Sequence, residues 1–433
     1  MSEAKGSVAV IGAGIVGAAS ALSLAMDGWT VTVIEPNDPG SGCSMGNAGH
    51  IGVTSVIPWS TPQNVRQSFK MLRNPLHPLK MPVNGWLENV GWMMRFLAAA
   101  RPKNVAHEIR ILNELCQYGW HTLDPLVKDA DARELINDRG VFYVYASEGS
   151  FRGGHEHNEL RRKLGRTIVE LSGDELREME PNLGPVVAKG VHLPEVYSVS
   201  HPQELARRFV RATLRRGGDE IREAVADIRM AEGNKVAVSF SGGERVFDKV
   251  VLSAGIGSRR FFPKLGVTVP MTAEYGYHLQ MTGFSELLGR SVAFVDKRVV
   301  FSPMAEGMRL TSGAVFANSK GNLRYDLPRR IFESAKHLLP ALRDLKGREW
   351  HDARPSTPDS LPIIGLSPKM ENVIVATGHG HTGLGQSGVA GRIVTMLANG
   401  AIGASDLAAI SPVRPMSLDA AQDTSMRPLR IGL

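Results

Sequence analysis

The chain has 433 residues, of which 43% are hydrophobic and 21% charged, a composition typical of a soluble globular protein with two domains. Only two cysteines, Cys43 and Cys116, are present, which argues against a disulfide framework or a cysteine zinc site and fits a reducing compartment. The sequence shows no signal-peptide pattern and no apolar run near the roughly 18 residues of a membrane span. The net charge of +7 is spread along the chain, so we interpret it as a solvated basic surface and expect no nucleic-acid partner.

The stretch near the N-terminus predicts a nucleotide-binding βαβ unit. Residues 8–11 and 31–34 are short apolar runs of the kind that form parallel strands buried on both faces. Gly12, Gly14 and Gly17 follow the first run in the G-x-G-x-x-G pattern, which provides a tight turn, close approach of the backbone to a pyrophosphate and close helix packing. Strand, glycines, helix and strand in this order predict a dinucleotide site. A purely structural βαβ unit with the same glycines is the alternative.

Glu35 ends the second apolar run, where a carboxylate can accept hydrogen bonds from both ribose hydroxyls and repels a 2′-phosphate. The glycine-rich segment 36–50 follows, and its backbone N–H groups can approach an anion closely. Residues 42–46 also match G-x-S-x-G, the pattern of a hydrolase nucleophile. That nucleophile needs a strand that runs directly into the serine turn. A loop precedes Ser44 instead, so we do not predict a serine hydrolase.

Residues 59–128 differ in composition from the preceding segment. They contain clustered prolines and helical patterns over 86–100 and 105–127. Basic side chains alternate there with aromatic ones. These are Arg66, Lys70, Arg73, Lys80, Arg95, Arg101 and Lys103, and Phe69, Trp86, Trp92 and Phe96. A basic surface with aromatic residues can lie on an anionic membrane. We favour an amphipathic helix whose aromatic side chains face the core, and we keep peripheral membrane contact as a hypothesis.

Alternating patterns in the middle of the chain predict a second, mostly antiparallel sheet. Its strands are expected at 140–145, 190–193, 271–282, 292–295, 299–302 and 308–312, with helical stretches at 159–180 and 329–342. A helix at 201–216, a hairpin around 232–234 and a buried strand at 250–255 return the chain to the nucleotide-binding layer. His155, Glu156 and His157 have no further ligand at zinc spacing, so we predict no metal site.

The last third contains a second glycine pattern. Residues 350–365 predict a proline-punctuated loop with one arginine, and residues 372–377 predict a strand. Glycines 378, 380 and 383 then repeat G-x-G-x-x-G before a helical run over 386–398. Two dinucleotide sites do not suit this spacing. We therefore predict that this helix N-terminus faces a flavin and stabilises negative charge on the reduced ring.

Several motifs, which occur in order along nearly the whole chain, together resemble those of a known protein family. They are the N-terminal βαβ unit, the loop Ser44-Met45-Gly46-Asn47-Ala48-Gly49, the strand end Ser253-Ala254-Gly255, the Arg354-Pro355 pair and Thr377-Gly378-His379-Gly380. Together they resemble the FAD-dependent amino-acid oxidoreductases of the D-amino-acid oxidase superfamily. Within it, the chain is most similar to bacterial D-amino-acid dehydrogenases, on the Asn47-Ala48-Gly49 loop, the Gly276-Tyr277 strand and the pairing of Arg354-Pro355 with Thr357-Pro358-Asp359.

The resemblance implies an α/β fold with two domains. One is a discontinuous Rossmann-like FAD-binding domain, and the other is an α+β substrate domain whose mostly antiparallel sheet covers the flavin. We expect the FAD-binding domain at 1–56, 196–268 and 350–433, the last part including a C-terminal tail, and the substrate domain at 57–195 and 269–349.

The resemblance also implies roles for single residues. FAD is expected to bind without a covalent link, with Cys43 a free thiol. Cofactor contacts are expected from Gly12, Gly14, Ile15, Val16, Gly17, Glu35, Pro36, Ser44, Asn47, Ala48, Gly49, His50, Val225, Ala254, Gly255, Gly380, Thr382, Gly383 and Leu384. Arg354 is expected to bind the substrate carboxylate, because its planar fork suits bidentate binding.

Four further side chains are expected near the reacting amine. Tyr277 is a candidate for a hydroxyl at the carboxylate or amine. A second arginine of related glycine oxidases is replaced here by His381. His50, His379 and His381 are the titratable groups that could help to deprotonate the amine, and none of them is singled out. We expect the two histidines of the second glycine pattern to be satisfied or substrate-facing, not a metal pair.

The expected reaction is oxidative deamination of a D-amino acid, in which hydride passes from the α-carbon to flavin and an imine or 2-oxo acid forms. Positioning is expected to supply most of the rate. D-Proline or cis-4-hydroxy-D-proline is the favoured substrate, and glycine, sarcosine or an L-imino acid is the alternative. A non-catalytic FAD- or NAD-binding module and an NAD-linked dehydrogenase are further alternatives. We expect a quinone-type acceptor and a cytoplasmic protein, peripheral on the inner face of the membrane if the basic region binds there. The oligomeric state stays open.

Overall fold

The computed structural model describes residues 5–71, 79–80, 88–317 and 325–414. Part of the expected basic and aromatic region lies outside these residues. Arg73, Trp86 and prolines 75, 78 and 82 are outside the described residues, as are the side chains of Phe69, Lys70 and Lys80 and the tail from residue 415. Within the described part of the chain, no helix is long and apolar enough to cross a membrane.

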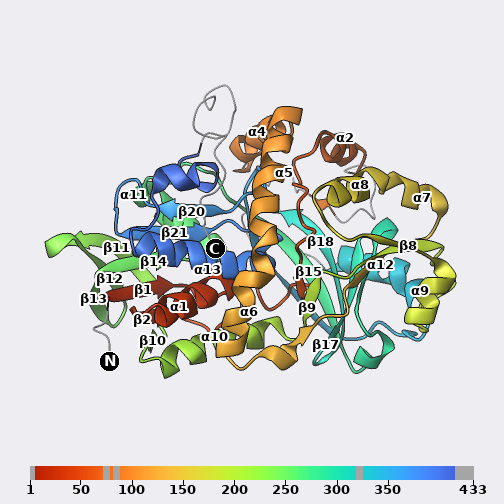
Figure 1. The fold of residues 1–433 in the computed structure, drawn as a ribbon, viewed down its shortest axis with the longest axis horizontal. Helices are drawn as coiled ribbons and strands as arrows, with labels where there is room; N and C mark the ends of the chain where they lie inside the picture. Colours follow the sequence, from red (N-terminus) through yellow and green to blue (C-terminus); the bar gives the residue numbers. More distant parts are fainter. Residues whose placement is uncertain (1–4, 72–78, 81–87, 318–324, 415–433) are drawn as a thin grey trace.

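A six-stranded sheet in the order β10-β2-β1-β14-β21-β20 forms one half of the molecule (Figure 1). At its centre, β1 (Ser7–Ile11) pairs in parallel with both β2 (Thr30–Ile34) and β14 (Lys249–Leu252). The outer strands are β10 (Asp219–Ile221), β21 (Val373–Thr377) and β20 (Ile363–Leu366), the last antiparallel to its neighbour. The central strands are mostly apolar because both faces of this sheet are covered.

Helices cover one face of this sheet and a small sheet covers the other. On the first face, α1 (Ile15–Met26) contacts α13 (Gly383–Ala398) and α10 (Pro202–Arg215) in a continuous buried core. The second face packs against antiparallel strands β11 (Val225–Ala231), β12 (Lys235–Phe240) and β13 (Gly243–Phe247). The predicted βαβ unit, the hairpin around 232–234 and the return of the chain at 250–255 are confirmed.

A nine-stranded sheet forms the other half, in the order β19-β15-β18-β17-β16-β6-β8-β7 with β4 (Leu79–Lys80) added to β18 (Figure 1). Its pairs are antiparallel except β16 with β6 and β18 with β4, so the predicted mostly antiparallel sheet is confirmed. The strands are β6 (Val141–Tyr145), β7 (Val169–Ser172), β8 (Lys189–Leu193), β15 (Thr272–Thr282), β16 (Ser291–Phe294), β17 (Val299–Met304), β18 (Gly307–Phe316) and β19 (Arg348–Ser356). Helix α12 (Asp326–Ala335) contributes to its core.

Further short elements join and flank the two halves. A small sheet contains β3 (His50–Ile51), β9 (Tyr197–Val199) and β5 (Ile136–Asn137). The remaining helices are α2 (Pro62–Met71), α4 (Val90–Ala99), α5 (Pro102–Gln117), α6 (Gly119–Asp129), α7 (Glu148–Gly153), α8 (His155–Lys163), α9 (Gly173–Met179) and α11 (Phe262–Leu265). Figure 1 shows α5 and α6 running across the molecule between the two large sheets.

Three local predictions are wrong in detail. The helical pattern over 105–127 is two helices, and Gly119 at their junction approaches α13 so closely that an added Cβ would lie 2.5 Å from the Gly385 carbonyl oxygen. The helical stretch over 159–180 contains strand β7, which pairs with β8. The loop expected at 350–365 begins as strand β19, which crosses the expected domain boundary at 349. Pro355 is tolerated there because β19 is an edge strand.

A buried ion pair fixes the segment after β19. The Arg414 Nε atom donates to Asp359 Oδ2 at 2.7 Å, and Nη2 donates to Oδ1 at 2.9 Å. The same guanidinium also donates to the carbonyl oxygens of Leu361 and Pro362 at 2.8 Å. Both charged side chains are almost fully buried, so removal of one partner leaves the other charge without compensation.

We predict that Arg414→Gln lowers the free energy of unfolding by about 3 kcal/mol or more, because Asp359 then stays buried without its cation. Denaturant titration of the purified protein measures this. Arg343 is exposed, so Arg343→Gln is the matched control and should stay within about 0.5 kcal/mol of the wild type. Equal stability of the two variants would contradict the assignment.

Candidate active site

The N-terminus of α1 is shaped to receive an anion. Gly12 has a φ of 98°, which favours glycine, and an added Cβ would lie 2.6 Å from the Ser253 carbonyl oxygen. At Gly17 an added Cβ would lie 1.9 Å from the Gly12 carbonyl oxygen, so only glycine lets α1 pack so close to the turn. Gly14 is the N-cap, without a side-chain cap, and the first helical turn carries no acidic residue. This helix end therefore suits a pyrophosphate.

Glu35 and Val225 lie at the carboxyl end of the six-stranded sheet. Glu35 Oε2 accepts a hydrogen bond from the Ala13 N–H at 3.0 Å, within the glycine turn. Val225, the first residue of β11, packs in the same buried core as Ile34 at the end of β2. The Glu35 carboxylate stays partly exposed, with Pro36 exposed beside it. The structure thus brings the predicted ribose and adenine contacts to one edge of the sheet.

Side chains of the nine-stranded sheet bind four consecutive carbonyl groups of the loop at 45–48. Arg309 Nη1 donates to the carbonyl oxygens of Met45 at 2.7 Å and Asn47 at 3.0 Å. Ser302 Oγ donates to that of residue 48 at 2.9 Å, and His278 Nδ1 lies 3.3 Å from that of residue 46. Burial lowers the pKa of Arg309 to about 10, so it remains charged at neutral pH. We call these contacts the loop clamp.

The same loop is also fixed from within. Ser44 Oγ accepts a hydrogen bond from the Ile15 N–H at 2.9 Å, which joins the loop to the first turn of α1. Asn47 Nδ2 donates to the Ser44 carbonyl oxygen at 2.6 Å, and Asn47 Oδ1 accepts from the Gly49 N–H at 2.6 Å. Gly49 has a φ of 82°, and an added Cβ would lie 2.5 Å from the Val199 carbonyl oxygen. These contacts hold the loop at 44–49 in a single backbone conformation where it passes the N-terminus of α1.

The second glycine pattern lies at the same edge of the six-stranded sheet. Gly380 has a φ of 50°, and its N–H donates to the Pro355 carbonyl oxygen at 3.1 Å. Thr382 is the N-cap of α13, which begins with Gly383 and Leu384. Val16 of α1 is the neighbour of Gly383, 3.9 Å from an added Cβ there. The N-termini of α1 and α13 therefore lie side by side, because each helix follows a parallel strand.

Ala254 and Gly255 complete this edge, directly after β14. The Gly255 carbonyl oxygen accepts a hydrogen bond from Thr377 Oγ1 at 3.0 Å, which ties the end of β14 to the end of β21. These residues lie beside the Gly12 turn, as the close approach of Gly12 to Ala254 shows. The expected cofactor residues thus converge from three parts of the chain.

His50 and His379 supply two buried polar atoms without partners. The Nε2 atoms of both imidazoles are buried and have no hydrogen-bond partner among the described residues. Burial lowers the pKa of each histidine to about 4, so both are neutral at physiological pH. Buried polar atoms are usually hydrogen-bonded. Two orphaned nitrogens beside glycine-rich loops therefore fit a polar ligand at this edge of the sheet.

Arg354, Glu274 and His381 form a charged cluster at the edge of the nine-stranded sheet. Arg354 Nη1 lies 3.2 Å from Glu274 Oε1, and His381 Nε2 lies 2.6 Å from the same oxygen. Ser356 Oγ donates to Glu274 Oε2 at 2.6 Å. Burial acts to raise the pKa of Glu274, but His381 and Arg354 outweigh it and hold the pKa at about 2. The Trp59 ring lies 4.8 Å from the His381 ring, at the exposed side of the cluster.

Tyr277 lies on the opposite face of β15 from Glu274, against the prediction that its hydroxyl meets the substrate carboxylate or amine. Along β15, Glu274 and Gly276 point toward Arg354, and the alternation of a strand directs Tyr277 away from it. Its ring packs against Tyr325 and His351 at 5.7 Å, and the side chain is 2% exposed. Burial raises the pKa of Tyr277 to about 12.

The sequence did not predict a role for three residues that the structure places at the site, which are Glu274, Arg309 and Trp59. Glu274 and Arg309 are charged residues inside strands that contain no other charged carboxylate or guanidinium side chain, and both are at most 5% exposed. A charge at such a position is seldom buried without a partner. A charged residue at a buried strand position could therefore have indicated Glu274 and Arg309. Nothing in the sequence indicated Trp59, because a single tryptophan before a helix forms no recognisable pattern.

The remaining sequence candidates take no part in this cluster. Cys43 is a free cysteine, and burial together with the Asp352 carboxylate raises its pKa to about 12, so the thiol is protonated at neutral pH. No three metal-ligating side chains gather anywhere in the described ranges, and the histidines at 155 and 157 are on α8.

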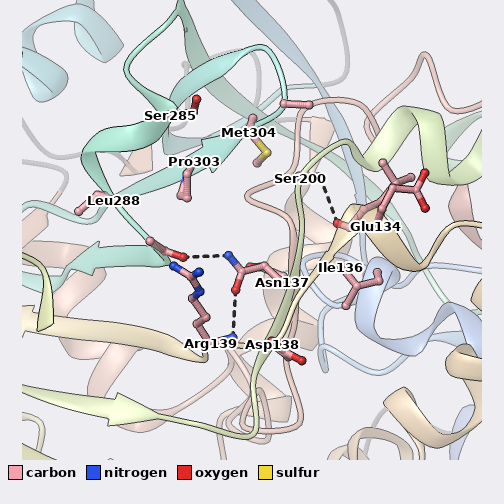
Figure 2. A pocket seen from close by; sticks show the side chains of 14 residues that line it. Glu134, Ile136, Asn137, Asp138, Arg139, Ser200, Ser285, Leu288, Pro303 and Met304 are labelled. Carbon is pink, nitrogen blue, oxygen red and sulfur yellow. Dashed lines mark hydrogen bonds between the residues drawn. The ribbon is translucent and has the colours of Figure 1, made fainter.

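A cavity of about 500 Å³ lies between β5, β9 and β17, away from Arg354 (Figure 2). Asn137 bridges its wall, because Nδ2 donates to the Gly289 carbonyl oxygen and Oδ1 accepts from the Arg139 N–H, both at 2.9 Å. None of its lining residues is an expected site residue, and none carries an unpartnered buried side-chain atom. The lining gives no indication of a ligand.

A mostly parallel sheet with two helix N-termini at one edge, joined to a mostly antiparallel sheet whose side chains bind the loop at 45–48, is typical of a dinucleotide-binding protein. Residues 7–397 match the family described as DAO, FAD dependent oxidoreductase, and the chain belongs to this family. FAD is therefore its cofactor. The uncapped α1 N-terminus and the orphaned nitrogens of His50 and His379 fit that group.

Relatives and solved structures agree with this assignment. The chain is 30% identical over 417 residues to a D-amino-acid oxidase of Bradyrhizobium diazoefficiens, covering 94% of this chain and 98% of that protein. It is 28% identical over 403 residues to a D-amino acid dehydrogenase of Paramagnetospirillum magneticum, covering 91% and 95%. The glycine oxidase of Geobacillus kaustophilus has a TM-score of 0.73 at 22% identity, covering 95% and 99%, and the L-proline dehydrogenase of P. horikoshii has 0.70 at 16%, covering 95% and 98%. These two likenesses show the fold.

We predict that Glu35→Ala weakens FAD binding about 10-fold or more, because hydrogen bonds to a charged group contribute about 1.5–3 kcal/mol. Flavin fluorescence during titration of apoprotein with FAD measures the dissociation constant. Glu178 is exposed on α9, and Glu178→Ala should bind FAD as the wild type does. Unchanged affinity of Glu35→Ala would exclude the ribose role.

Proposed function

We propose that this enzyme oxidises a D-amino acid at the α-carbon. The observation that carries the proposal is the Arg354, Glu274 and His381 cluster, on the same face of the nine-stranded sheet as the loop clamp. A guanidinium suits a carboxylate, and a carboxylate–imidazole pair suits an amine. The named D-amino-acid relatives support the same reaction.

Arg354 has the capacity to hold a substrate carboxylate. Its hydrogen bonds within the described residues use Nη1, to Glu274 and to the Gly313 carbonyl oxygen. Nη2 and Nε therefore remain for a ligand. Gly276 makes room for the guanidinium, since an added Cβ would lie 2.2 Å from Nη2. A carboxylate held bidentately fixes the α-carbon in one position, which is the main source of rate in such a site.

The cofactor-binding residues described above would hold FAD along the edge where α1 and α13 begin. When bound, FAD supplies the two-electron acceptor for the hydride of the α-carbon. Glu274 and Arg354 are mostly buried, so they would shield the carboxylate end of the substrate from water. The imine that leaves the site hydrolyses to a 2-oxo acid, or remains cyclic when the substrate is a proline.

We favour a compact substrate for this site. Trp59 and His381 pack against one another at its solvent side and narrow the approach. This favours a small cyclic amino acid such as D-proline or cis-4-hydroxy-D-proline. Glycine, sarcosine or an L-imino acid is the second candidate, because it would use the same Arg354 contact and differ only in pocket shape.

We predict that D-proline or cis-4-hydroxy-D-proline bleaches the flavin absorbance near 450 nm under anaerobic conditions, and that L-proline does not. Arg354→Lys should retain FAD but require about 100-fold more substrate, because an ammonium cannot replace the bidentate fork. Arg348, at the start of the same strand, is exposed, so Arg348→Lys is the control and should behave as wild type.

Other results of the bleaching experiment would contradict separate parts of the proposal. Bleaching by glycine, sarcosine or L-imino acids alone would replace the D-amino acid with the second candidate. Wild-type behaviour of Arg354→Lys would exclude Arg354 as the carboxylate ligand. No bleaching by any amino acid would exclude the proposed reaction.

We further propose that electrons pass to a quinone and that α4 meets the inner face of the cytoplasmic membrane. Trp92 faces inward and donates to the Ser356 carbonyl oxygen at 3.0 Å, in line with the core interpretation of the aromatic residues. The opposite face of α4 exposes Val90, Met94 and Leu97, at 50%, 64% and 45%. Exposed basic residues Arg95, Arg101 and Lys103 surround this stripe. An apolar stripe among basic residues suits an anionic bilayer.

We predict that the protein cosediments with anionic phospholipid vesicles at low salt. Met94→Glu with Leu97→Glu should reduce binding about 10-fold or more, because two charges enter the apolar stripe. Val246 is 50% exposed on β13, and Val246→Glu is the control. No binding of the wild type, or equal binding of both variants, would exclude this surface. Faster flavin reoxidation by a soluble quinone than by oxygen tests the acceptor.

A further inference from the structure

We propose that His381, held by Glu274, is the base that accepts a proton from the ammonium group of the substrate. The inference rests on the proposed function and names a residue for a step that it leaves open. An amino acid arrives mainly as its ammonium form at neutral pH, and the amine must be neutral before its α-carbon gives up hydride. A group in the site therefore has to take up one proton.

The hydrogen bond between Glu274 and His381 selects the tautomer that the step needs. The distance from Glu274 Oε1 to His381 Nε2 is 2.6 Å. An ionised carboxylate only accepts hydrogen bonds, so Nε2 carries the hydrogen and the lone pair is on Nδ1. The Arg354 guanidinium, with Nη1 3.2 Å from Oε1, and the Ser356 hydroxyl, which donates to Oε2 at 2.6 Å, stabilise the ionised form of Glu274 whether or not His381 is charged. Nδ1 of His381 is thus the atom able to accept a proton.

The cluster is also rigid and reachable. Ser356 Oγ fixes the second oxygen of Glu274 at 2.6 Å, and the carboxylate is 5% exposed. The Trp59 ring lies 4.8 Å from the imidazole with an interplanar angle of 34°. His381 itself is 30% exposed, so a ligand can approach it. Arg354 and His381 contact the same oxygen of Glu274, so one carboxylate positions both the proposed carboxylate ligand and the proposed base.

The other two candidate histidines lack these features. His50 and His379 are buried, without a carboxylate partner, and burial lowers the pKa of each to about 4. An imidazolium at either position would have no counterion among the described residues. These histidines are suited to a neutral, hydrogen-bonding role toward the cofactor. Of the three candidate histidines, His381 is the one with a carboxylate, that of Glu274, to balance the positive charge of its protonated form.

The charges balance before and after the transfer. The charged groups that face His381 are Glu274 on β15 and Arg354 on β19, whereas Trp59 is uncharged. An N–H bond of the ammonium breaks and an Nδ1–H bond forms, and the electron pair stays on the substrate nitrogen. The new imidazolium then pairs with Glu274, and the substrate carboxylate pairs with Arg354. No charge is left alone in the site.

The test is the pH dependence of anaerobic flavin reduction, followed by stopped flow with the amino acid that bleaches the wild type. His381→Gln should reduce flavin about 100-fold more slowly at pH 7, the scale of general base catalysis. Its rate should recover at alkaline pH, where the free amine form of the substrate is abundant. Glu274→Gln should show a smaller loss, because it keeps an acceptor for Nε2 but not the charge.

His351→Gln is the matched control. His351 is an exposed histidine on β19 that contacts Tyr277 on the opposite face of the sheet, and its loss should leave the pH profile unchanged. Equal flavin content and melting temperature of all variants exclude a folding defect. A His381→Gln profile with the wild-type shape would overturn the proposal. A flat loss of rate at every pH would also overturn it, because that result indicates a structural role alone.

A second readout does not depend on turnover. α-Methyl-D-proline has no α-hydrogen and cannot be oxidised, yet it carries the same ammonium and carboxylate. In protein labelled with ¹⁵N-histidine, the His381 signals are those absent from His381→Gln. Binding should shift its Nδ1 signal to that of an imidazolium, and an unshifted signal in the bound protein would overturn the proposal. If no amino acid bleaches the wild type, the proposed function fails; if bleaching is normal and only these tests fail, the inference alone is wrong.

Discussion

Four consecutive carbonyl groups at 45–48 turn toward the nine-stranded sheet and bind its side chains, and the rest of the site depends on this loop clamp. Arg309 is a buried cation, so it has to be surrounded by acceptors, and two of these carbonyl oxygens serve it. Such charge-assisted hydrogen bonds are among the stronger ones in proteins. The clamp brings the glycine-rich loop, which starts beside α1, against the sheet that carries Arg354. The sheet edge with the two helix N-termini and the cluster of Arg354, Glu274 and His381 therefore meet at one surface.

The sequence predicts the cofactor half well because its signal is local. Gly12, Gly14 and Gly17 lie between two strands within one short stretch, and the structure gives a steric reason for Gly12 and Gly17. Arg354 was identified from a motif, although its strand was expected to be a loop. Pro355 suggested that loop, and the position of β19 at the edge of its sheet removes the conflict.

The substrate half is less predictable because its geometry comes from register between distant strands. Glu274 and Arg354 are 80 residues apart and face one another only through the pairing of β15 with β19. A shift of one residue in that pairing would turn every side chain to the other face. Tyr277 shows the consequence: its place in the sequence next to Gly276 suggested the site, whereas strand alternation places it in the core behind the sheet.

Helix α4 is linked to the cluster of Arg354, Glu274 and His381 by two hydrogen bonds. Trp92 donates to the Ser356 carbonyl oxygen, and the Ser356 hydroxyl donates to Glu274, which in turn orients His381. The outer face of α4 is the apolar stripe that we propose for membrane contact. A helix that is displaced at the surface would therefore move the carboxylate that orients the base. On these two proposals, α4 both contacts the membrane that supplies the quinone and supports the carboxylate that orients His381. The exposed apolar residues of α4 then have a function in membrane contact.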